Sequence, residues 1–285
     1  MTTEPAAADF SGQTLHQARF TGTTLIQANA ADALVRFSNL QGLTIRECDV
    51  DRLEIDSHDL FFGSLVVNGV DVVPLVKAEL NRQYPGRELM ETNDPEGLRE
   101  GFQAVKAAWA ATVEQTPAEL REATVRGEWS LSQTLRHLVL VTDAWLRSGI
   151  QQEPEPFQPI GQVFDGAQEM GFDMTRMRPA KDFDEILAVR AERQRMVEDF
   201  LDTVTQSQLD QAARNPWDPQ GKWRPSVGDC IRVVLEEWAH LRCIRRDLAA
   251  QHPGPGDWCA AGACGPSRAV VPGAGGSGPM GCCWM

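Results

Sequence analysis

The first 70 residues carry an apolar side chain at every fifth position, and this period constrains the fold more than any other feature. The thirteen positions are Phe10, Leu15, Phe20, Leu25, Ala30, Val35, Leu40, Ile45, Val50, Ile55, Leu60, Leu65 and Val70. A period of five fits neither an α-helix, which repeats every 3.6 residues, nor a flat strand, which repeats every two. It fits a solenoid in which each five-residue face places one apolar side chain inward.

The same segment resembles the pentapeptide-repeat family. Small side chains stand two residues before many of the apolar positions, at Ala8, Ala18, Thr23, Ala28, Ala33, Ser38 and Cys48. Gln13, Leu43 and Leu53 depart from this rule. The resemblance implies a short right-handed β-solenoid over residues 1–72. Because a solenoid needs a capped end, residues 73–93 are expected to form a capping helix, with Pro74 in its first turn, and a linker.

From residue 94 onward the apolar period changes to 3.6, which is typical of amphipathic helices. Four helices are predicted, at about residues 95–115, 130–147, 182–204 and 226–249. Ser130 with Gln133, and Ser226 with Asp229, have the spacing of helix N-caps and their partners. The segment 149–180 is interrupted by prolines and is expected to be a long loop. An all-α four-helix bundle over residues 94–250 follows as the predicted second domain.

Two motifs on these helices resemble the DinB-like superfamily. The run Gly127-Glu128-Trp129-Ser130-Leu131-Ser132-Gln133-Thr134-Leu135-Arg136-His137-Leu138 resembles its second helix, and Glu236-Glu237-Trp238-Ala239-His240 resembles its last. The glutamate-first form is similar to the branch of mycothiol-dependent maleylpyruvate isomerases. The resemblance covers about residues 94–250. It implies a four-helix bundle that holds a divalent metal, and a thiol-dependent transferase or isomerase activity.

The resemblance, carried over by position, implies that His137, Glu236 and His240 bind the metal. Residues four apart lie about 40° apart on a helix, so Glu236 and His240 can aim at one point. Such a His₂Glu set leaves a fourth zinc position open, as catalytic zinc sites do. The helical wheel favours Glu237 in place of Glu236, so Glu237 remains the alternative. Zinc is the first expectation, with nickel or iron as alternatives and a low-molecular-weight thiol as cosubstrate.

Bulk composition narrows the remaining classes of function. The net charge of −13 argues against a protein that tracks nucleic-acid phosphates. No apolar run reaches the roughly 18 residues needed to span a bilayer, and no signal-peptide pattern opens the chain. Cys48, Cys230 and Cys243 are expected as small buried side chains in a reducing cytoplasm. The Gly-, Pro- and Cys-rich tail, residues 251–285, is expected to be disordered.

Three hypotheses for function follow. The first is a metal-dependent transferase or isomerase that acts on a small electrophilic substrate, without nucleic-acid or membrane partners and with homodimerisation left open. No residue is identified as its general base. The alternative is a non-catalytic interaction protein that uses the solenoid as a docking surface. The third, a DNA-mimicking topoisomerase binder, ranks below both because the solenoid is short.

Overall fold

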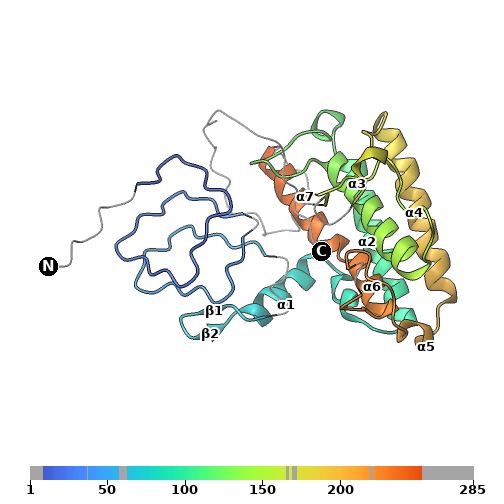
Figure 1. Cartoon of the computed structure of the whole chain (residues 1–285), viewed down its shortest axis with the longest axis horizontal. Helices are drawn as coiled ribbons and strands as arrows, with labels where there is room; N and C mark the ends of the chain where they lie inside the picture. Colours follow the sequence, from blue (N-terminus) through green and yellow to red (C-terminus); the bar gives the residue numbers. More distant parts are fainter. Residues whose placement is uncertain are drawn as a thin grey trace. The chain divides into compact units, whose positions relative to one another are not determined.

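The computed structural model describes residues 9–36, 38–57, 63–164, 167–168, 172–218 and 221–251. The chain divides into two compact units, Met1–Ile55 and Asp56–Met285 (Figure 1). Leu60 of the five-residue series and residues 252–285 of the predicted tail lie outside the described residues. None of the helices in the described part of the chain is long and apolar enough to cross a membrane.

The backbone of the first unit repeats with the predicted period. A turn recurs every ten residues, with the amide of Gln13 donating to the carbonyl of Phe10 at 3.0 Å. The equivalent bonds join Thr23 to Phe20, Ala33 to Ala30, Leu43 to Leu40 and Leu53 to Val50. Each turn contains a residue with a positive φ angle, and a second such residue lies midway between successive turns. In the described residues, positive φ angles therefore recur at five-residue spacing, at Gly12, Gln17, Gly22, Gln27, Asp32, Gly42, Glu47 and Arg52. Glycine adopts a positive φ angle without strain, and it occupies three of these positions.

The described part of the first unit nevertheless contains no strand, and no β-solenoid is shown. The apolar side chains that the period predicts to face inward are half exposed, from 45% at Leu15 to 70% at Leu25. Cys48 is also exposed, which corrects the expectation that it is buried. Without ladder pairing between neighbouring turns, no interior is closed around these side chains. The repeat is therefore present in the backbone, and the solenoid stays a prediction.

The second unit opens with a short hairpin and a helix. Strands β1, Val66–Val67, and β2, Val70–Asp71, pair antiparallel, with Val67 opposite Val70. Helix α1 then covers Val73–Gln83 and has Pro74 in its first turn, as predicted. The chain continues through a 3₁₀ turn, η2, at Arg87–Glu91.

The remaining elements confirm an all-α region after residue 94. They are α2 Pro95–Gln115, η3 Ala118–Leu120, α3 Leu131–Thr142, the π-helix η4 Asp143–Ile150, η5 Met174–Arg176, α4 Phe183–Thr203, α5 Gln206–Leu209, α6 Val227–Leu235 and α7 Glu237–Gln251. Ser130 with Gln133 and Ser226 with Asp229 form reciprocal capping boxes, as their spacing predicts. The long helices α2, α3, α4, α6 and α7 (Figure 1) enclose one apolar core. Phe102, Trp109, Leu138 and Leu201 are fully buried in it.

One helix boundary differs from the prediction and matters for the site. The single helix expected over residues 226–249 is divided at Glu236, where ψ is 0°. The amide of Ala239 donates to the carbonyl of Glu236 at 2.9 Å, a three-residue bond that tightens the turn. No glycine or proline marks this break in the sequence. Glu236 therefore occupies a junction between two helices, and His240 lies in the first turn of α7.

Candidate functional site

Helices α3 and α7 bring two histidines together in the second unit, one of them buried and the other half-buried. The ring centroids of His137 and His240 are 5.1 Å apart, with an angle of 61° between the ring planes. The indole of Trp129, just before α3, lies 4.8 Å from the His137 ring on centroid distance. The two histidines are 103 positions apart in sequence, so the packing of α3 against α7 alone creates the pair.

Both imidazoles are kept neutral. Burial, the largest cause, and the neighbouring His240 lower the pKa of His137 to about 3, although the hydrogen bond to the Gln162 carbonyl acts in the opposite direction. Burial and the charge of Arg242 lower the pKa of His240 to about 4. The Nδ1 atom of His137 lies 3.2 Å from the Gln162 carbonyl oxygen. A proton on Nδ1 would serve that contact, and Nε2 would then carry the lone pair that a metal requires.

Glu236 is half-buried, but the structure does not join it to the histidine pair. Burial alone raises the pKa of its carboxyl to about 7. Among the described residues no group of three His, Cys, Asp or Glu side chains is arranged to hold a metal. Of the three predicted ligands, the structure thus brings His137 and His240 together, and Glu236 lies at the junction of α6 and α7.

The alternative ligand, Glu237, is engaged elsewhere. Its carboxylate accepts a hydrogen bond from the guanidinium of Arg190 on α4, and both side chains are almost completely buried. Burial raises the pKa of Glu237, and the charge of Arg190 lowers it. Because this ion pair crosses from α7 to α4, Glu237 belongs to the packing of the helices and not to the neighbourhood of His240.

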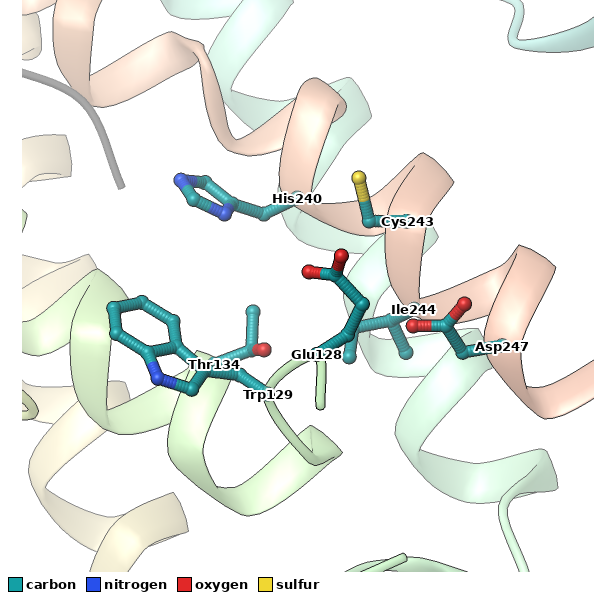
Figure 2. A pocket seen from close by; sticks show the side chains of 7 residues that line it. All are labelled: Glu128, Trp129, Thr134, His240, Cys243, Ile244 and Asp247. Carbon is teal, nitrogen blue, oxygen red and sulfur yellow. The ribbon is translucent and has the colours of Figure 1, made fainter. Parts of the chain in front are cut away.

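A small pocket opens beside His240 (Figure 2). Its walls come from α7, from the start of α3 and from the segment just before α3. The lining residues are Glu128, Trp129, Thr134, His240, Cys243, Ile244 and Asp247. In Figure 2 the carboxylate of Glu128 is directed toward the side where His240 and Cys243 lie.

Sequence reasoning missed the functional potential of Glu128, Cys243 and Asp247. Cys243 and Asp247 stand three and seven residues after His240, which places all three on one face of α7. That spacing is a signal the sequence contains. Glu128 precedes α3 and reaches the pocket only through the fold, so no local pattern identifies it.

The family model described as the DinB superfamily matches residues 102–244, which is half of the chain. These residues include α3 and the first two turns of α7, and with them His137, Glu236 and His240. No curated protein and no solved structure matches the chain.

Proposed function

Because the chain belongs to the DinB superfamily, we propose that its helical region binds one divalent metal ion through His137, His240 and Glu236. The observation that carries the proposal is the pair of neutral imidazoles on α3 and α7, of which His137 is buried and His240 is half-buried. Imidazole binds a metal only when it is neutral, and burial keeps both rings in that form. Zinc is the first candidate, and nickel or iron are alternatives.

The spacing of the two rings fits a shared ion. Zinc–nitrogen bonds are about 2.0–2.1 Å, so two imidazoles on one tetrahedral zinc have ring centroids roughly 5 Å apart. The observed separation of 5.1 Å is of this size. The contact of His137 Nδ1 with the Gln162 carbonyl also matches the outer-shell hydrogen bond that orients histidine ligands.

Glu236 supplies the third ligand in this proposal. A half-buried carboxyl with a pKa of about 7 lacks a compensating positive charge, and a nearby metal ion would favour its ionised form. In this proposal the carboxylate of Glu236 binds the ion together with the two imidazoles, which a shift of its side chain would allow. Its position at the junction of α6 and α7, and not within a continuous helix, supports that movement. The engagement of Glu237 with Arg190 supports Glu236 over the alternative.

The proposed activity is a thiol-dependent transfer or isomerisation of a small electrophile. A divalent ion on three protein ligands has an open position, where it would lower the pKa of a bound thiol or water. The chain's own residues then bind and orient the substrate in the pocket beside His240. Trp129 and Glu128 line that pocket.

Elemental analysis of the zinc-loaded, dialysed full-length protein tests the metal site. We expect about one zinc per chain and its loss in His137→Ala and His240→Ala. His16→Ala, in the first unit, is the matched control and should keep the metal. Equal zinc content in all four proteins would refute the assignment. Glu236→Gln is expected to weaken binding without abolishing it, because both imidazoles remain.

A second function is favoured by the surface of the first unit. Leu25, Ile26, Leu34 and Leu43 are each more than 60% exposed, and exposed apolar patches often mark interaction sites. In this alternative the chain is a non-catalytic interaction protein, and a second copy is the simplest partner. Sedimentation should then show a dimer that dissociates in Leu25→Glu/Ile26→Glu. A wild-type protein that is monomeric at high concentration would exclude self-association.

A further inference from the structure

A cavity of about 200 Å³ lies in the second unit, where the end of η4, the end of α4, α5 and the start of α6 meet. This volume corresponds to roughly six water molecules at about 30 Å³ each. Ile150 lines the cavity and follows His137 by 13 positions along α3 and η4, so about 15–20 Å of helix separates the two residues. Folded proteins contain few voids larger than a water molecule, so a hollow of this size is a candidate binding site of its own.

Backbone hydrogen bonds tie the walls of this cavity to one another. The amide of Val227, the first residue of α6, donates to the carbonyl of Gln211 at 2.8 Å. The amide of Arg214 donates to the carbonyl of Gly149 at 3.1 Å, which joins the segment after α5 to η4. Neither bond involves a side chain of the cavity. The fold itself therefore forms the cavity, as is usual for sites that bind small molecules.

The cavity combines apolar walls with a rim of side-chain amides. Its apolar side chains include Ala213 and Val227, which are buried, and Ile150 and Phe200, which are half-buried. All of its polar side chains are glutamines, and they are exposed to solvent: Gln152, Gln208 and Gln211. None of the described residues that line it is charged. An apolar interior with a few polar groups at its edge is the usual composition of a small-molecule site.

Gln152 owes its place on this rim to the way in which η4 ends. The element is a π-helix, a form that is frequent at functional sites, and it ends at Ile150. Two residues later Gln152 has a φ of 53°, a left-handed conformation that is uncommon for residues other than glycine. The backbone therefore fixes the position of this side-chain amide at the edge of the cavity.

We propose that this cavity binds a small uncharged molecule that combines an amide group with a compact apolar body. A glutamine amide offers one acceptor oxygen and two donor hydrogens, so it can pair with an amide ligand through reciprocal hydrogen bonds. The Oε1 atom of Gln208 already accepts from the amide and the hydroxyl of Thr205, each at 2.9 Å. Gln152 and Gln211 are therefore the assigned partners. A charged ligand would lose hydration without meeting an opposite charge among the lining residues.

Benzamide, benzoate and benzamidine test this inference, because they share size and shape but are neutral, anionic and cationic at pH 7. Their binding to the metal-free full-length protein is measured by saturation-transfer NMR and titration. We expect benzamide to bind with a dissociation constant on the order of 1 mM. It should bind about tenfold more tightly than either ion, which has to give up its hydration. The inference does not rest on the proposed metal function, and metal-free protein keeps the two tests separate.

Two variants, each with a matched control, test whether benzamide binds in this cavity. Ala212→Phe adds a ring to a lining residue that is exposed and should abolish binding, whereas Ala110→Phe, at an exposed position of α2, should not. Gln211→Leu removes one hydrogen-bonding partner and should weaken binding about fivefold. Gln115→Leu, at the exposed end of α2, should bind benzamide as wild type does.

Equal binding of the three probes, or a preference for either ion, would overturn the proposal. So would benzamide affinity that is unchanged in both Ala212→Phe and Gln211→Leu. Thermal melting shows whether each variant is folded, and the two substitutions act by different means, one by filling space and one by removing an amide. A folded variant of either kind therefore decides the question.

Discussion

The buried ion pair between Arg190 and Glu237 gives a sharp test of how the helical region is held together. The two side chains are 3% and 0% exposed, and they join α4 to α7. Arg190 Nε, Arg190 Nη1 and Glu237 Oε2 have no hydrogen-bond partner in the structure. Burial therefore removes water from both charges without replacing all of their hydrogen bonds, so the pair as a whole should contribute little to stability. Either charge left buried alone should be strongly destabilising.

Removing one partner should therefore cost far more than removing both. Arg190→Met leaves the Glu237 carboxylate buried and unpaired, and we expect it to lower the free energy of unfolding by about 3–5 kcal/mol. Arg190→Met/Glu237→Met removes both charges and should stay within about 1 kcal/mol of wild type or exceed it. Urea denaturation of the metal-free protein at pH 7, followed by tryptophan fluorescence, measures both values. Arg178→Met breaks an exposed pair with Glu185 and should change little.

The single variant should also depend on pH in a defined direction. Burial already raises the pKa of Glu237, and loss of Arg190 removes the charge that lowers it. A carboxyl with a folded-state pKa above its unfolded value destabilises the fold as pH rises through that range. The deficit of Arg190→Met relative to wild type should thus shrink as pH falls toward 4.5. A double variant as unstable as the single one, or a deficit independent of pH, would refute this reasoning.

Three further predictions concern the two histidines, the N-cap of α3 and the close contact of Gly86 with Ala104. The pKa values of His137 and His240 are about 3 and 4 in the folded protein. Below about pH 6.5, each histidine should therefore lower the free energy of unfolding of the metal-free protein by roughly 1.4 kcal/mol per pH unit. In urea titrations, His240→Gln should lose less stability than wild type between pH 7 and 5. Ser130→Ala removes the capping box of α3 and should cost about 1 kcal/mol, whereas Ser38→Ala, outside any helix, should cost little. Gly86→Ala should cost more than about 1 kcal/mol, because φ is +90° and the added Cβ would lie 2.6 Å from Ala104 Cβ; unchanged melting would contradict this geometry.

The helices could be predicted from the sequence because their determinants are local. The 3.6-residue period of the core side chains and the caps at Ser130 and Ser226 lie within a few positions of the elements they define. The break at Glu236 could not be predicted, since no glycine or proline causes it. The five-residue period likewise appears in the backbone turns, but a buried interior depends on contacts between distant turns.

The site shows the same division between local and non-local information. Motif resemblance identified His137 and His240, and the structure pairs them. The helical wheel favoured Glu237 over Glu236, because it cannot include the partner that engages Glu237, Arg190, which lies 47 residues away. Asp247 shares a helix face with His240 and was detectable from spacing. Glu128 reaches the pocket only when the segment before α3 packs against α7, which no sequence period encodes.

X-ray absorption of the zinc-loaded full-length protein tests the central claim most directly, because it counts the ligands of the ion. The account predicts two imidazole nitrogens at about 2.0–2.1 Å with further oxygen ligands, and one imidazole in either His137→Ala or His240→Ala with residual zinc. A spectrum without paired imidazole scattering, or one that is the same in wild type and both variants, would contradict a metal site built on His137 and His240.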